Sequence, residues 1–302
     1  MKHVFMISKE LSDELWQEKK EYFNSFDYIV TSDTAPLSRI FMENLHEVKP
    51  TIIVWVCNRF DYSMESDWSF YQTFTNISKN HTDKFKIIPY SDFEGIYCSL
   101  KNVHNLLPAI TPIGRNPIDI DVINNYAEDN GTFKHINDLK DKVFIPIYGN
   151  DNNFFKLKNI LESHEISCYN GGYDDAKDLK NCLCMVTFPD AFSKLMTFET
   201  IQNEVIVLLP SEEFLIKLHP TNNNGHNYWF NHPLGLLVKN SIKLCEWYRY
   251  KECRIYFDSI EDLIHKIKTL DNDVLEEKRR WCRHYGEQIE AKCMEAWRNV
   301  FV

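Results

Sequence analysis

The pattern that most constrains the fold is a repeated alternation of short apolar runs with amphipathic stretches of helical period. The clearest run, Thr-Ile-Ile-Val-Trp-Val-Cys at 51–57, is continuous and rich in β-branched residues. Such runs predict strands that are covered on both faces, and strands that alternate with helices predict parallel pairing. The chain is therefore expected to have a parallel α/β organisation.

The alternation occurs in two rounds. The first round has expected strands at 4–7, 28–30, 51–57 and 86–88, and the second at 143–148, 166–169, 183–187, 205–209 and 254–257. Between the rounds, 107–141 holds three prolines and shows no clean period, which is typical of a linker or crossing segment. We therefore expect two Rossmann-like domains, with the C-terminal helical region broken near Gly286. The expected segments are 1–115, a linker at 116–141, 142–280, and a C-terminal helix at 281–302.

The composition restricts the class of protein and its partners. The 302 residues are 44% hydrophobic, which is enough to bury a core. The net charge of -10 argues against nucleic acid as the main partner, because phosphate binding needs clustered Lys and Arg. No apolar run reaches the roughly 18 residues of a transmembrane helix, and the apolar N-terminus is too short for a signal peptide. We therefore expect a cytoplasmic protein, whose nine scattered cysteines are buried, reduced thiols.

A ligand site is predicted where the expected strand at 183–187 leads through Pro189 into the next helix. A helix N-terminus presents backbone N–H groups and a positive dipole end, and both favour anions. At the carboxyl edge of a parallel sheet, this is where nucleotides and phosphates bind. Ser193, Lys194 and Thr197 would contribute hydroxyls and an ammonium group there. The alternative is that Ser193 is an ordinary helix cap.

The same segment resembles the donor-sugar half of GT-B glycosyltransferases. That family has a Pro, a small-residue phosphate loop, a Glu on the following helix, and a strand of the form PVI. Here Pro189, Ser-Lys-Leu-Met-Thr at 193–197, Glu199 and Val-Ile-Val at 205–207 stand in those places. The resemblance is sharpest over 143–210 and 256–297.

The resemblance implies a GT-B fold, in which two Rossmann-like domains face across a cleft and C-terminal helices return towards the first domain. It also implies transfer of a sugar from a UDP- or GDP-linked donor to a hydroxyl of a glycan or small-molecule acceptor. Retaining members carry an earlier Glu, at a place that Ala191 occupies here, so inversion is favoured.

The donor-site residues that follow from the resemblance and from the strand ends are Gly149, Asn150, Tyr169, Asn170, Ser193, Lys194, Leu195, Met196, Thr197 and Glu199. Glu199 would accept the ribose hydroxyls, and the alternative is a solvated helix carboxylate. Gly149 would let the backbone approach phosphate, and the alternative is a simple turn. Tyr169 would stack on the base, and the alternative is a core aromatic residue.

The first domain should supply the acceptor site and a general base. Asp33 and Asp61 are the candidate bases, because each follows an expected strand. The alternatives are that Asp33 only helps to cap the next helix and that Asp61 is an ordinary loop acid. Arg59 would steady the leaving diphosphate or an anionic acceptor.

No metal or other cofactor is expected to be required. Glycosyltransferases of the other major fold use an Asp-x-Asp metal motif, which Asp119-Ile-Asp121 and Asp271-Asn-Asp273 match formally. With 44 acidic residues such matches arise by chance.

Two other functions stay open: a non-catalytic module that binds nucleotide sugars or glycans, and a nucleotide-sugar epimerase or hydrolase. A Rossmann dehydrogenase is disfavoured, because no Gly-x-Gly-x-x-Gly follows an early strand.

Overall fold

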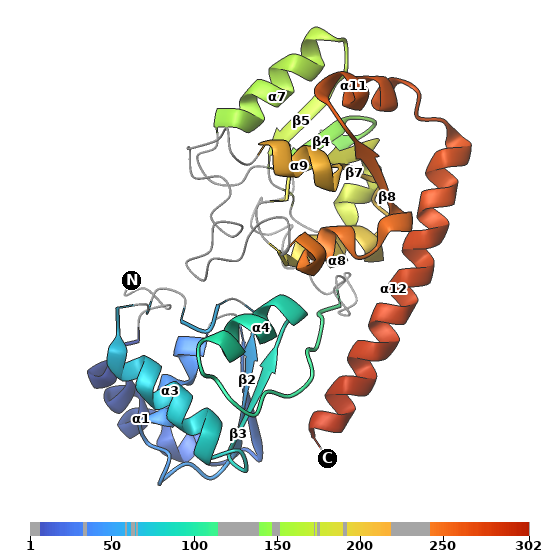
Figure 1. Ribbon diagram of the computed structural model, residues 1–302. Coiled ribbons are helices and arrows are strands. Elements are labelled where there is room, and N and C mark those ends of the chain that lie inside the picture. Colours follow the sequence, from blue (N-terminus) through green and yellow to red (C-terminus); the bar gives the residue numbers. More distant parts are fainter. Residues whose placement is uncertain are drawn as a thin grey trace, which may run out of the picture. The chain divides into compact units, whose positions relative to one another are not determined.

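The computed structural model describes residues 7–32, 35–57, 59–61, 64, 66–113, 139–146, 152–171, 173, 176–189, 192–218 and 242–301 (Figure 1). The chain divides into two compact units, Met1–Thr111 and Pro112–Val302. Each unit contains a sheet whose described strands are all parallel. The predicted parallel α/β organisation is therefore confirmed.

The first unit is built on a three-stranded sheet in the order β1-β2-β3. The strands are β1 (Tyr28–Thr31), β2 (Thr51–Val56) and β3 (Phe85–Pro89). The helices are α1 (Lys9–Phe23), the 3₁₀ turn η1 (Ala35–Ser38), α2 (Arg39–Met42), α3 (Trp68–Asn80) and α4 (Asp92–Leu100). Of the strand expected at 4–7, all but Ile7 lies outside the described residues.

The central strand β2 explains why its sequence is continuously apolar. Ile52, Ile53, Val54 and Val56 are fully buried, as expected of a strand covered on both faces. The helices α3 and α4 both pack on β3. Because parallel strands need crossover helices, α3 and α4 begin at the edge of the sheet where the preceding strand ends.

The second unit has a five-stranded sheet in the order β5-β4-β6-β7-β8. The strands are β4 (Val143–Pro146), β5 (Cys168–Gly171), β6 (Cys184–Val186), β7 (Val207–Pro210) and β8 (Arg254–Phe257). In this doubly wound order, β5 pairs with one side of β4, and β6, β7 and β8 extend from its other side. Its switch point lies between β4 and β6, and ligands of such sheets bind at the carboxyl ends of the strands there.

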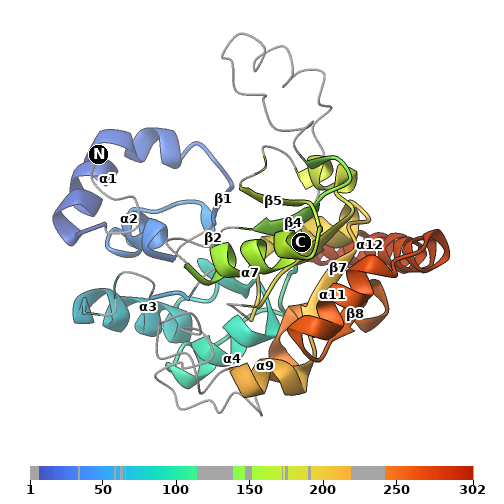
Figure 2. The same cartoon turned by 90° about the horizontal axis from the view of Figure 1, so that it is seen from above.

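Helices cover both faces of this sheet. They are α7 (Asn152–Ser163), α8 (Leu195–Gln202), α9 (Glu212–Leu218), α11 (Ile260–Lys268) and α12 (Asn272–Val300), with 3₁₀ turns η2 (Ala176–Asn181), η4 (Ile242–Leu244), η5 (Glu246–Tyr248) and η6 (Lys251–Cys253). Figures 1 and 2 show α7 and α12 on opposite sides of the strands. Leu161 and Leu263 join the apolar core formed by α7, α11 and the strands.

The predicted break in the last helix is wrong. α12 runs without interruption from Asn272 to Val300, and the predicted boundary between 280 and 281 falls inside it. Gly286 is buried where α12 packs on α8, and its carbonyl accepts a hydrogen bond of 2.9 Å from Gln202 Nε2. Glycine costs a helix interior about 1 kcal/mol, and this packing offsets it.

All nine cysteines are free, and all except Cys57 are buried, so the expected burial holds for eight of them. Among the helices of the described ranges, none combines the length and apolarity that a bilayer-spanning segment needs.

Candidate functional site

The start of α8 carries two buried hydroxyl groups without partners. The N-cap residue of α8 is Lys194, and no side chain caps the helix. The alternative of Ser193 as an ordinary cap is therefore not realised. Ser193 Oγ and Thr197 Oγ1 are both buried and have no hydrogen-bond partner among the described residues. The remaining predicted residues of this stretch are Leu195, which is exposed, and Lys194 and Met196, which are half-buried.

The end of β5 contributes a third side chain with buried polar atoms that have no hydrogen-bond partner among the described residues. Asn170 is half-buried, and both its amide oxygen and its amide nitrogen are buried without a hydrogen-bond partner in the described part of the chain. The ring of Tyr169 stacks on Phe144, with 6.1 Å between the centroids. A Cβ at Gly171 would lie 2.6 Å from the Tyr169 hydroxyl, so glycine is required for this arrangement.

Glu199 is held in place rather than solvated. It is half-buried, and its Oε2 accepts a hydrogen bond of 2.6 Å from the hydroxyl of Tyr173. The Tyr173 ring packs edge-on against Phe144, with 5.9 Å between the centroids. This contact joins the segment after β5 to α8, so it brings together the two groups of residues that the sequence predicted separately. Tyr173 itself was not predicted, although a tyrosine that closely follows a predicted strand end is a signal to consider.

A buried cation lies beneath α8, and sequence reasoning missed it. Arg254, at the start of β8, is 2% exposed. Its guanidinium donates to Thr200 Oγ1 and to the carbonyl of Thr197, both at 3.2 Å, and it lies 5.5 Å from the Trp247 ring centroid. Within the described residues it forms no ion pair with a carboxylate. Its positive charge therefore adds to the positive dipole end of α8.

In the first unit, Asp61 is buried and hydrogen-bonded. The Tyr97 hydroxyl donates to both carboxylate oxygens, at 2.9 Å each, and Lys101 Nζ lies 3.8 Å from Oδ2. Asp61 is therefore part of a fixed buried network rather than an ordinary loop acid. The other candidate base, Asp33, lies outside the described residues, as do Gly149 and Asn150.

A second buried carboxyl group, Glu94, accompanies Asp61. It lies on the first turn of α4 and is 5% exposed, and its Oε2 has no hydrogen-bond partner among the described residues. Burial raises the pKa of Glu94 to about 8, against the lowering effect of Arg59 and with a further raising effect from Asp61. The sequence pattern Ser-x-x-Glu predicts only a capping box here. Ser91 does accept from the Glu94 N–H, but the Glu94 carboxyl group is buried in the unit.

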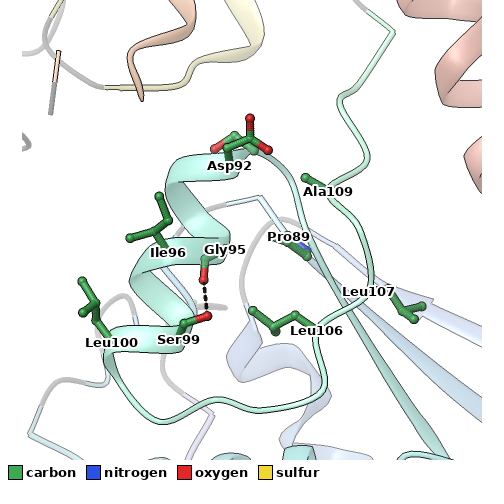
Figure 3. A pocket seen from close by; sticks show the side chains of 10 residues that line it. Pro89, Asp92, Gly95, Ile96, Ser99, Leu100, Leu106, Leu107 and Ala109 are labelled. Carbon is green, nitrogen blue, oxygen red and sulfur yellow. Dashed lines mark hydrogen bonds between the residues drawn. The ribbon is translucent and has the colours of Figure 1, made fainter. Parts of the chain in front are cut away.

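The first unit also has an open groove of about 500 Å³ on another face of α4 (Figure 3). Its lining is mainly apolar and comes from α4, from Pro89 at the end of β3 and from the segment 106–109, with Leu106 on the side of α4 that carries Gly95 and Ser99. Glu94 does not line it. The groove and the buried carboxyl group are therefore separate features.

No protein-family model matches this chain, and no curated protein matches it significantly. Its function is therefore argued from its own residues.

The two units offer different chemistry. The site around α8, Asn170 and Glu199 has unpartnered hydroxyl and amide groups, a positive field and one carboxylate, which suits an anion attached to a polyhydroxylated group. The first unit has two buried carboxyl groups beside Arg59, which suits proton transfer. In the described residues no three His, Cys, Asp or Glu side chains cluster closely enough to hold a metal ion.

Proposed function

We propose that the protein is a glycosyltransferase of the GT-B type. It moves a sugar from a UDP- or GDP-linked donor to an acceptor hydroxyl, with inversion and without a required metal. The observation that carries the proposal is the set of unpartnered polar atoms on Asn170, near the carboxyl end of β5, and on Ser193 and Thr197, which follow β6. Each such buried atom costs about 1–3 kcal/mol, so a ligand that satisfies them is favoured.

The donor binds to the second unit in this proposal. The backbone N–H groups in the first turn of α8, the hydroxyls of Ser193 and Thr197, and the Lys194 ammonium bind the diphosphate. Glu199, fixed by Tyr173, accepts the hydroxyls of the ribose. Asn170 supplies a donor and an acceptor to the edge of the nucleobase.

The transfer step is a substitution at the anomeric carbon. The acceptor oxygen forms a bond to this carbon, the bond to the phosphate oxygen breaks, and the nucleoside diphosphate leaves with the electron pair. The dipole of α8, Lys194 and Arg254 stabilise the charge that develops on the leaving group. Inversion is favoured because Ala191 replaces the first Glu of the retaining pattern. The acceptor proton passes to a general base.

A panel of donors tests the proposal. Melting temperatures are measured with UDP-, GDP-, dTDP- and CMP-linked sugars, with and without Mn²⁺, for the wild type, Glu199→Ala and the exposed α12 variant Glu287→Ala. We expect one nucleotide class to stabilise the wild type and Glu287→Ala without metal, but not Glu199→Ala. No stabilisation by any donor, or an undiminished one in Glu199→Ala, contradicts the site.

Turnover then separates the enzyme from its alternatives. Proton NMR of the selected donor with candidate acceptors is expected to show a new glycoside whose anomeric configuration is opposite to that of the donor. Binding without turnover would instead identify a nucleotide-sugar-binding module. Conversion of the donor alone would identify an epimerase or hydrolase.

A further inference from the structure

The first unit carries an open apolar groove that the proposed transfer does not use. The groove has a volume of about 500 Å³, within the range of small-molecule sites, and it runs along α4 (Figure 3). Its other side is the segment 106–109, which backbone hydrogen bonds hold beside β3. The Leu107 N–H donates to the Ile87 carbonyl at 2.9 Å, and the Ile110 N–H donates to the Pro89 carbonyl at 3.0 Å. All the described lining residues belong to one unit, so the groove is complete within it.

Small side chains keep the groove open. Gly95 and Ser99 lie on the side of α4 that carries Leu106 (Figure 3). A Cβ at Gly95 would lie 3.4 Å from Pro89 Cγ, at the short end of ordinary van der Waals contact, so the packing does not require glycine. Glycine is the weakest helix former other than proline. Its place in α4 therefore costs helix stability and leaves space that a larger side chain would fill.

The polar groups of the lining are available to a ligand at one end only. Ser99 Oγ donates to the Gly95 carbonyl at 2.9 Å, and Ser91 Oγ accepts from the Glu94 N–H at 3.3 Å, so both hydroxyls have partners within α4. Among the described residues that line the groove, Asp92 alone is charged, and it is exposed. It stands in the first turn of α4, shortly after the carboxyl end of β3, and ligands of parallel sheets bind at that edge.

These features select the chemistry of a ligand. An extended peptide would bring backbone N–H and C=O groups for which the walls offer no partners, whereas an alkyl chain needs none. A chain in the groove would also cover Ile96 and Leu100, whose side chains are 38% and 52% exposed. The Asp92 carboxylate accepts hydrogen bonds from hydroxyls and repels an anionic head group. A cationic head group would gain little, because the exposed carboxylate is already offset by the dipole of α4.

We propose that the groove along α4 binds an amphiphile that has a single alkyl chain and an uncharged, hydroxyl-bearing head group. The chain lies between α4 and the segment 106–109, and the head group donates hydrogen bonds to Asp92. This inference goes beyond the proposed transfer and does not depend on it, because all the described residues of the groove lie in the first unit.

The test is a calorimetric titration of octyl, nonyl and decyl glucosides, below their micelle-forming concentrations, into the wild type and three variants. Ser99→Leu and Ala109→Leu fill the groove from its two sides. Ser69→Leu is the matched control, since Ser69 is an exposed residue of α3 outside the groove. We expect the affinity of the wild type and Ser69→Leu to rise about fourfold with each added methylene. The two groove variants should bind at least about 10-fold more weakly, with a smaller dependence on chain length.

A second titration tests the head group at pH 7. In Asp92→Asn we expect decanoate to bind about fivefold more tightly than in the wild type, because a repulsive charge is removed. Decyl glucoside should bind this variant more weakly than the wild type. Unchanged affinities of Asp92→Asn for both compounds would overturn the placement of the head group.

Two results would overturn the site itself. One is equal binding of the glucosides to the wild type and both groove variants, which would show that the alkyl chain binds elsewhere. The other is the absence of glucoside binding together with a dimer, detected by sedimentation, that Ser99→Leu abolishes. That result would show that a second copy of the chain covers the groove.

Discussion

At the scale of single residues, the proposed donor site depends on polar side chains that the fold buries without a hydrogen-bond partner among the described residues. The side-chain hydroxyls of Ser193 and Thr197 and the side-chain amide of Asn170 have no hydrogen-bond partner among the described residues. These atoms therefore contribute no hydrogen-bond energy to the folded protein. Such groups are expected to limit stability and to favour ligand binding. Substitutions that remove them therefore separate the two effects.

Removal of the two hydroxyls should have opposite effects on folding and on binding. We expect Ser193→Ala and Thr197→Val to change the free energy of unfolding by no more than about 0.5 kcal/mol, or to increase it, because no hydrogen bond is lost. Each should weaken donor binding by roughly 10-fold, because a hydrogen bond to a charged phosphate is lost. Urea unfolding and calorimetric titration measure the two quantities. A large loss of stability with unchanged affinity would show a purely structural role.

Glu94 makes a prediction about stability and pH. Its pKa is raised to about 8 in the folded protein from an ordinary value of 4.5. Between these values the folded state holds a proton that the unfolded state has released, so this group's contribution to stability is lost as pH rises towards 8. Glu94→Gln cannot titrate. Its stability relative to the wild type should therefore increase from about pH 5 to about pH 8, by an amount on the order of a few kcal/mol.

Urea unfolding of both proteins at several pH values across this window tests the point. Asp92→Asn serves as the control, because its carboxylate is exposed. Parallel stability curves for the wild type and Glu94→Gln would show that the Glu94 carboxyl group is not protonated in the folded protein.

At the scale of elements, α8 is the helix on which the proposed donor site is built. Arg254 supports its first turns by donating to Thr200 and to the carbonyl of Thr197. The positive charge and the helix dipole act in the same direction on an anion at the helix start.

Arg254→Met should therefore weaken donor binding by about 10-fold, while Arg254→Lys, which keeps the charge, should weaken it less. Arg283→Met is a suitable control, since Arg283 is a partly exposed residue of α12 that pairs with Glu204. Calorimetric titration of the donor measures the effect. Equal affinities for the Met and Lys variants would show that the charge of Arg254 does not act on the donor.

The strands were largely predictable from the sequence because burial on both faces leaves a continuous apolar run. β8 was predicted at its observed bounds, and β2 to within one residue. β7 begins two residues later than predicted: Val205 and Ile206 are buried but precede the ladder, which starts where Val207 pairs with Arg254. An apolar run in the sequence indicates which residues are buried. The ends of a strand depend instead on which residues form backbone hydrogen bonds with the neighbouring strand. The break predicted at Gly286 was wrong because packing on α8 outweighs the low helix propensity of glycine.

Of the candidate site, the residues near α8 followed from a local motif, but their neighbours did not. Tyr173 lies 26 residues from Glu199, and Arg254 lies 54 residues from Thr200. These contacts depend on which strands are neighbours in the sheet, and the order of the strands cannot be predicted from the local sequence. The burial of the Glu94 carboxyl group was not predicted either. A Ser-x-x-Glu pattern is the same whether the Glu is exposed in a capping box or buried in the unit.

At the scale of the whole molecule, we propose that one of the two units binds the donor. We place the proposed donor site in the unit Pro112–Val302. Hydrogen exchange with the donor bound should therefore show slower exchange in α8 and around β5, with unchanged exchange in β2 and β3. Protection confined to the first unit would reverse the assignment.

A calorimetric titration of UDP- and GDP-linked sugars into the wild type, Glu199→Gln and Glu287→Ala tests the proposed donor site at α8. We expect one donor class to bind the wild type and Glu287→Ala equally. Glu199→Gln should bind it at least about 10-fold more weakly, because the ribose hydroxyls lose a charged acceptor. Equal affinity of all three proteins, or no binding of any nucleotide sugar, would contradict a donor site at α8.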